Sequence, residues 1–157
     1  MSVNIGISDD NRQKVVAILN TLLADEFLLY TKSRNYHWNV VGPEFNDLHK
    51  FFETLYEAQD EIIDEVAERT RALDGRAFGT LEEFRSKARL GEKPGAVPAA
   101  REMLAALLAD HEALIRTLRE DVDTVNDKLH DVGTADFLTG LLEKHEKTAW
   151  MLRSFLA

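Results

Sequence analysis

From Ser8 to about Val40, apolar residues recur every three or four positions, which is the period of an amphipathic α-helix. The apolar stripe consists of Val16, Leu19, Leu23, Phe27 and Tyr30. Serine is a common N-cap residue, and the two aspartates that follow Ser8 stabilise the positive end of a helix. The pattern therefore predicts one long helix that begins at Ser8 and ends near Val40.

A second long helix is predicted after Gly42 and Pro43, where the helical period resumes. The period continues for about thirty residues to Gly75, and glycine is the residue most often found just beyond a helix C-terminus. Because the break between the two helices is short, we expect them to be antiparallel neighbours.

The second half of the chain predicts a crossover and two more long helices. Thr80 and Glu83 have the spacing of a capping box and predict a short helix. A third long helix is expected from about Val97 to His130, and a fourth, capped by Thr134, nearly to residue 157. Four long helices with one long connection describe an all-α bundle of the ferritin-like type. A simple up-down bundle without any site shows the same pattern, so the fold alone does not decide the function.

The composition narrows the chemistry that such a bundle can carry. The chain has 157 residues, 45% of them hydrophobic, which suffices for one domain over residues 1–157 with a short non-basic extension at residues 1–7. It lacks cysteine, so iron, manganese or zinc would be held by histidine and carboxylate. The formal net charge of -9 disfavours nucleic acid. Without a basic leader or a long apolar run, we expect a cytoplasmic protein with no membrane segment.

The five histidines do not have the spacing of an interior di-iron site. Ferritin-like di-iron bundles place Glu-x-x-His pairs on helices that face the bundle interior. The residues three positions before the histidines are Arg34, Asn46, Leu108, Asp127 and Leu142. None of them is glutamate, so we expect any metal centre to be assembled in another way.

His37, His49 and Glu53 are predicted to meet near the turn between the first two helices. The two histidines stand about six residues before and after that turn, and therefore at the same level of an antiparallel pair. Glu53 is one helical turn beyond His49. The three side chains can therefore converge from two adjacent helices.

Asp64 and Glu68 form a second pair on the same face of the second helix, roughly 22 Å from the first pair along the axis. A second copy of the chain, related by a two-fold axis near Ala58, would bring its Asp64 and Glu68 to His49 and Glu53. Each pair alone is equally typical of a solvated helix face. Two histidines and three carboxylates together suit iron.

The same residues carry a resemblance to a known family. The segments 37–40 (HWNV), 48–49 (LH) and 64–69 (DEVAER), with Gly42 and Phe45, resemble the signature of the Dps family, the miniferritins of the DNA-protection-during-starvation group. The resemblance covers nearly the whole chain. It implies a dodecameric shell that oxidises Fe(II), preferentially with hydrogen peroxide rather than dioxygen, and stores ferric mineral, protecting against oxidative damage. The implied ferroxidase ligands are His37, His49 and Glu53 of one subunit and Asp64 and Glu68 of its two-fold neighbour.

Further roles follow from the resemblance alone. Glu53 stands where the family more often has aspartate, which affects the occupancy and spacing of the second iron, and zinc or manganese are potential competitors. Trp38 matches a tryptophan beside the centre, as a radical trap or an interface aromatic. Asp127, Asp131 and Asp136 match a region that lines three-fold pores and would attract Fe(II), although Asp131 is equally suited to cap a helix.

The remaining candidates are assigned no chemistry. His111, His130 and His145 are expected to be surface or satisfied polar residues, and Trp150 a core or subunit contact. Family members that bind DNA generally use basic terminal tails, whereas the first basic residue here is Arg12, so we expect weak or absent DNA binding, and nucleoid association only if DNA binds after all. Two alternatives remain: a structural or DNA-associated shell with a degenerate or zinc-filled site, and a monomeric di-metal oxygenase.

Overall fold

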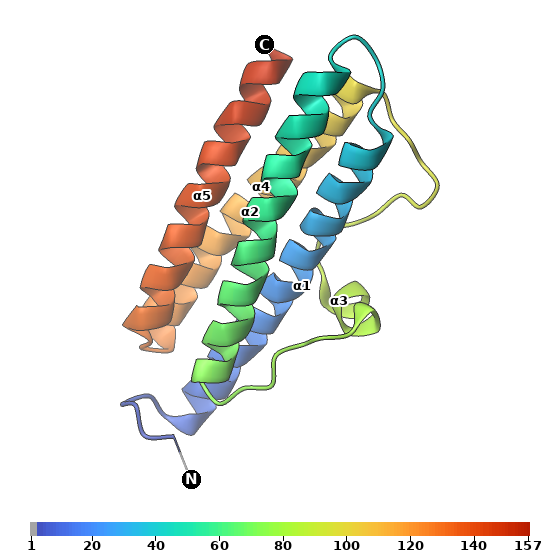
Figure 1. Ribbon diagram of the computed structural model, residues 1–157. Helices are drawn as coiled ribbons and strands as arrows, with labels where there is room; N and C mark the ends of the chain where they lie inside the picture. The colour runs from blue at the N-terminus through green and yellow to red at the C-terminus, as the bar shows by residue number, and fades with distance from the viewer. Residues whose placement is uncertain (1–2) are drawn as a thin grey trace.

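Four long helices lie side by side in the computed structural model of the protein, which describes residues 3–157 (Figure 1). They are α1 (Asp9–Asn39), α2 (Phe45–Ala72), α4 (Ala100–Asp123) and α5 (Val132–Leu156). The connection from α2 to α4 carries the short α3 (Leu81–Lys87), which packs on α1 outside the bundle. No strand occurs within residues 3–157, and the predicted all-α bundle with one crossover is confirmed.

The core consists of the apolar stripes of the four helices. Its largest fully buried side chains include Leu19, Leu22, Leu29, Leu48, Phe52, Leu107, Leu114, Leu118 and Leu138. Burying each such side chain contributes about 1.5–3 kcal/mol, so these stripes supply most of the stability of the bundle. None of the helices in the described chain combines the length and the apolar composition that a membrane span requires.

The two predicted N-caps at Ser8 and Thr80 are confirmed. The Ser8 hydroxyl accepts a hydrogen bond from the backbone N–H of Asn11 at 3.2 Å, and α1 begins at the next residue after the cap. Thr80 and Glu83 form the complete capping box at the start of α3. Both caps are local interactions, which is why the sequence pattern alone located them.

The predicted C-terminus of the second helix was displaced by a few residues. The helix α2 ends at Ala72, and Asp74 rather than Gly75 adopts the left-handed conformation, with φ of 60°. Gly75 is needed for a different reason, because a Cβ there would lie 2.5 Å from Cγ1 of Val16. The close packing of this turn against α1 therefore requires glycine.

The junction between the third and fourth long helices also differs from the prediction. The helix α4 ends at Asp123 and continues as a short π-helix, η1 (Thr124–Lys128). Asp131, not Thr134, is the N-cap of α5, since its carboxylate accepts from the Thr134 N–H at 3.0 Å. The Thr134 hydroxyl donates to the same carboxylate at 2.5 Å, so the threonine supports the cap instead of providing it.

Candidate metal centre

The turn between α1 and α2 brings His37 and His49 into direct contact. Gly42 makes this turn possible with a φ of 123°, a conformation that favours glycine. The two imidazole rings stack with centroids 3.8 Å apart and planes inclined by 20°. The Phe45 ring also stacks on His49, with centroids 5.1 Å apart. The predicted approach of the two histidines therefore occurs within a single chain.

Reciprocal hydrogen bonds fix the protonation pattern of both rings. The Nδ1–H of His37 donates to the backbone carbonyl of His49 at 2.7 Å, and the Nδ1–H of His49 donates to the carbonyl of His37 at 2.8 Å. A carbonyl oxygen can only accept, so Nδ1 must carry the proton in each ring. In the neutral rings both Nε2 atoms are then lone-pair donors. Metal-binding histidines are commonly oriented in this way by carbonyl groups.

Glu53 lies one turn further along α2, and its carboxylate is held by Tyr56. The phenolic O–H of Tyr56 donates to Oε1 of Glu53 at 3.4 Å, and the Tyr56 ring meets the His37 ring edge-on at 5.2 Å. Burial raises the pKa of Tyr56, and the nearby Glu53 carboxylate acts in the same direction. The phenol therefore remains a hydrogen-bond donor at neutral pH.

Arg34 organises the aromatic side chains around this site. Its guanidinium carbon lies 4.5 Å from the Tyr56 ring centroid, 5.5 Å from that of Tyr30 and 5.4 Å from that of Trp38. It also donates a hydrogen bond to the Tyr30 hydroxyl at 2.6 Å, which raises the pKa of Arg34. Trp38 itself is 65% exposed. No role was predicted for Arg34 or Tyr56 from the sequence, although each stands three residues from a predicted ligand.

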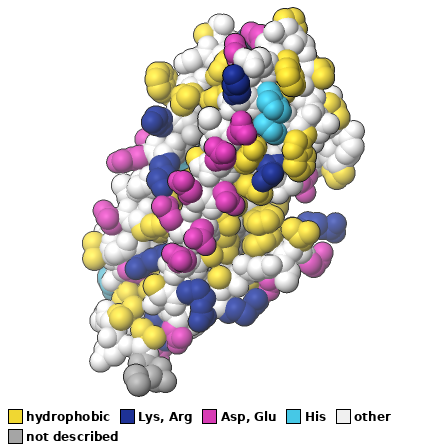
Figure 2. All heavy atoms as spheres, viewed as in Figure 1, with side chains coloured by type: hydrophobic (Ala, Val, Ile, Leu, Met, Phe, Trp, Pro, Cys, Tyr) yellow, Lys and Arg dark blue, Asp and Glu magenta, His cyan; other side chains and the backbone are white. Residues whose placement is uncertain are grey.

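Asp64 and Glu68 do not join the histidines within one chain. Both are exposed on α2, and neither makes a hydrogen bond or an ion pair within residues 3–157. The described residues contain no group of three or more histidine, aspartate and glutamate side chains arranged to hold a metal ion. Acidic side chains interspersed with basic ones gather on the face shown in Figure 2. One chain thus presents the predicted ligands as two separate sets.

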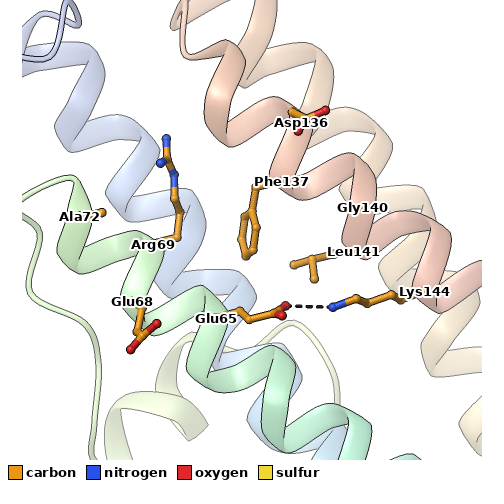
Figure 3. A pocket seen from close by; sticks show the side chains of 9 residues that line it. All are labelled: Glu65, Glu68, Arg69, Ala72, Asp136, Phe137, Gly140, Leu141 and Lys144. Carbon is orange, nitrogen blue, oxygen red and sulfur yellow. Dashed lines mark hydrogen bonds and ion pairs between the residues drawn. The ribbon is translucent and has the colours of Figure 1, made fainter.

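A cavity of about 620 Å³ between α2 and α5 adjoins Glu68 (Figure 3). It is also lined by Asp136, one of the predicted pore residues, and by Arg69. Glu65 and Lys144 face each other across it and form an ion pair of 2.9 Å. The cavity therefore places a predicted iron ligand and a predicted pore residue along one groove.

The three aspartates near the start of α5 differ in their environment. Asp131 is only 3% exposed, and it binds Thr134 and the guanidinium of Arg69, whose Nη2 lies 3.3 Å from Oδ1. Its carboxylate is used to cap the helix. Asp127 and Asp136 are exposed, and they remain predictions as pore residues.

Two of the unassigned histidines lie inside the bundle. His145, on α5, is hydrogen-bonded through Nε2 to Oε1 of Glu26 on α1 at 2.8 Å. Its Nδ1 lies 2.9 Å from Nδ1 of His111 on α4, while the ring centroids are 5.1 Å apart, so the two nitrogens point almost directly at each other. Gln59, on α2, is buried beside them. We call Glu26, His145 and His111 the buried row. In the contact between its two imidazoles, one Nδ1 donates the hydrogen bond and the other accepts it. His130, in contrast, is exposed.

The buried row predicts a loss of stability in acid. Burial lowers the pKa of His111 well below its usual value, and the adjacent His145 acts in the same direction. The unfolded chain takes up this proton near pH 6.5, whereas the folded chain stays neutral to lower pH. The free energy of unfolding should therefore fall as the pH falls below about 6.5, and His111 should contribute up to about 1.4 kcal/mol per pH unit to this fall. Above about pH 6.5, His111 should not affect the pH dependence of stability.

Urea unfolding between about pH 7.5 and pH 5 measures this dependence. His111→Leu should reduce the slope of stability against pH, because the titrating group is gone. His130→Asn, an exposed histidine whose left-handed backbone (φ 57°) asparagine tolerates, is the matched control and should keep the wild-type slope. Equal slopes for the wild type and His111→Leu would show that this ring does not cause the acid sensitivity.

Comparison with known proteins identifies the family. The ferritin-like domain family matches residues 16–157. A low temperature-induced protein of Nostoc sp. is 53% identical over 98% of this chain and 86% of its own length. DNA protection during starvation protein 2 of Bacillus anthracis is 36% identical over 92% of this chain and 97% of its own length. The chain belongs to the Dps family.

A solved structure agrees with this membership. The Dps protein of Vibrio cholerae, a member of a broad superfamily of ferritin-like diiron-carboxylate proteins, superposes with a TM-score of 0.92 at 30% identity, covering 100% of this chain and 98% of that chain. Membership in the Dps family indicates iron binding, iron storage and protection against oxidative damage.

Proposed function

We propose that this Dps protein oxidises Fe(II) at sites shared between two subunits and stores the ferric product. The observation that carries the proposal is the reciprocal hydrogen bonding of His37 and His49, which leaves a lone pair on each Nε2. These nitrogens and the Glu53 carboxylate, one turn away, supply the imidazole and oxygen ligands that iron accepts.

We infer that a partner subunit supplies the rest of the site. Asp64 and Glu68 are exposed and unpaired among the described residues, and they lie roughly 22 Å along α2 from His49 and Glu53. The midpoint between the two pairs falls at the level of Ala58 along α2, so a two-fold axis at this level pairs two antiparallel α2 helices. A two-fold axis at this residue completes two identical sites.

The chemistry of the proposed site is a paired oxidation. Iron is the substrate, and each of two Fe(II) ions gives up one electron to hydrogen peroxide, which takes up two protons and yields two water molecules. Transfer of both electrons at one site avoids the hydroxyl radical that a single electron would produce. The carboxylates of Glu53, Asp64 and Glu68 offset the additional positive charge of Fe(III).

Storage requires the subunits to enclose a cavity, and we propose a dodecameric shell entered through acidic pores. Asp127 and Asp136 are exposed and can attract Fe(II) at such pores, whereas the Asp131 carboxylate is used to cap α5. Zinc and manganese prefer similar ligands and are expected competitors. Subunits with a net charge of -9 should bind DNA weakly or not at all near physiological salt.

Anaerobic addition of Fe(II) to metal-free protein, followed by peroxide, tests the proposal. Ferric ultraviolet absorbance should rise much faster than in buffer, and many irons per shell should co-elute with the protein in gel filtration. Oxidation no faster than in buffer, with iron precipitating outside the protein, would favour the alternative of a structural shell with a degenerate or zinc-filled site. Light scattering of the same sample distinguishes a dodecamer from a monomeric oxygenase.

A further inference from the structure

Tyr56 contacts two of the three candidate iron ligands that this chain provides at one site. Its ring meets His37 edge-on, with centroids 5.2 Å apart and planes inclined by 79°. Its hydroxyl donates to Oε1 of Glu53 at 3.4 Å. Tyr56 is itself only partly buried, so its hydroxyl is not required to fill the core.

Arg34 holds the Tyr56 ring from the side of α1. The guanidinium lies over the ring at 4.5 Å, the shortest of its three aromatic contacts. Arg34 forms no ion pair with a carboxylate in the part of the chain that the structure describes, and its one side-chain hydrogen bond goes to Tyr30. Such cation–π contacts fix the ring without competing for Glu53.

The extra methylene of Glu53 makes such support necessary. A glutamate has one more rotatable bond than an aspartate, and fixing it costs more conformational entropy when it binds a metal. The Tyr56 hydroxyl can restrict this freedom before the metal arrives, because it already lies 3.4 Å from one carboxylate oxygen and donates a long hydrogen bond to it. Outer-shell partners of this kind typically raise metal affinity by about 10–100-fold.

We propose that Tyr56, held by Arg34, is a positioning residue that orients Glu53 for metal binding. The proposal rests on the proposed ferroxidase function and goes beyond it, since it adds a residue that binds no iron itself. It also accounts for the presence of glutamate at position 53: the longer side chain reaches the phenol, whereas an aspartate carboxylate is one methylene shorter.

Anaerobic titration of the assembled, metal-free protein with Co²⁺, followed by visible absorbance and calorimetry, tests the proposal without any turnover. Tyr56→Phe keeps the ring contacts with His37 and Arg34 and removes only the hydroxyl. It should weaken Co²⁺ binding at the Glu53 position by about tenfold. Tyr36→Phe is the matched control, because the buried Tyr36 packs on Phe52 and its side chain makes no hydrogen bond or ring contact with a candidate ligand among the described residues. It should bind Co²⁺ like the wild type.

A double-mutant cycle with Glu53→Asp decides whether the hydroxyl acts through Glu53. In the Glu53→Asp background, Tyr56→Phe should cause no further loss of affinity. Wild-type affinity in Tyr56→Phe, or an equal loss in both backgrounds, would overturn the positioning role. A variant lacking Asp64 and Glu68 distinguishes failure of this proposal from failure of the proposed ferroxidase site. If Co²⁺ binding is lost in that variant but unchanged in Tyr56→Phe, the ferroxidase site stands and only the role of Tyr56 is wrong.

Discussion

Replacing both Asp64 and Glu68 with alanine should slow Fe(II) oxidation by peroxide by more than about 100-fold while the shell stays assembled. Loss of an outer-shell partner alone costs about 10–100-fold in affinity or activity, and this variant loses two of the proposed direct ligands of each site. Neither residue supports the fold of the subunit, since both are exposed and form no hydrogen bond or ion pair in residues 3–157. Their removal also relieves repulsion on an acidic helix, so stability should change by less than about 0.5 kcal/mol.

The matched control removes the same charge away from α2. Glu82 and Glu92 are exposed carboxylates in the connection from α2 to α4, and their side chains form no hydrogen bond or ion pair within residues 3–157. Glu82→Ala with Glu92→Ala should oxidise iron at close to the wild-type rate in stopped-flow absorbance. Gel filtration of both variants should show the wild-type elution volume. If both double variants oxidise iron equally fast, Asp64 and Glu68 are not ligands, and the inferred two-fold site is wrong.

The parts of the structure that the sequence predicted are those set by local interactions. The N-caps at Ser8 and Thr80 depend on residues within one turn, and the approach of His37 and His49 depends on one tight hairpin. The predicted N-cap at Thr134 was wrong because α5 begins earlier, and Asp131 is its N-cap. Glycine is required at position 75 because a Cβ there would clash with Val16, which lies on another helix. A contact between distant segments cannot be read from the local sequence pattern.

The environment of the site and the buried row depended on contacts between helices. Arg34 and Tyr56 lie on different helices, so their stacking follows from the register of α1 against α2. Glu26, His111 and His145 come from three helices, and only the assembled bundle aligns them. The sequence nevertheless held a sign of the buried row, because polar residues occur there on the apolar face of a helix. Glu26, for example, lies among Leu22, Leu23 and Leu29.

Replacing His145 with leucine should destabilise the protein by about 3–5 kcal/mol, since it leaves the buried carboxyl group of Glu26 without a hydrogen-bond partner. Glu26 is fully buried, and His145 provides its only hydrogen bond among the described residues; the second carboxylate oxygen has no partner. Urea unfolding at a fixed protein concentration measures the loss, because the stability of an assembly depends on concentration.

The double variant Glu26→Leu with His145→Leu tests the cause of that loss. With no unpaired polar group left at positions 26 and 145, two leucines can pack against Leu22 and Leu29, and stability should recover by at least about 2 kcal/mol relative to His145→Leu alone. Replacing both members of a buried polar pair with apolar residues is often tolerated, whereas replacing only one member is destabilising. Two outcomes would show that the unpaired Glu26 carboxyl group does not cause the loss of stability: wild-type stability in His145→Leu, or a double variant that is less stable than His145→Leu. The buried row would then contribute through packing, and its hydrogen bonds would add little to the stability of the bundle.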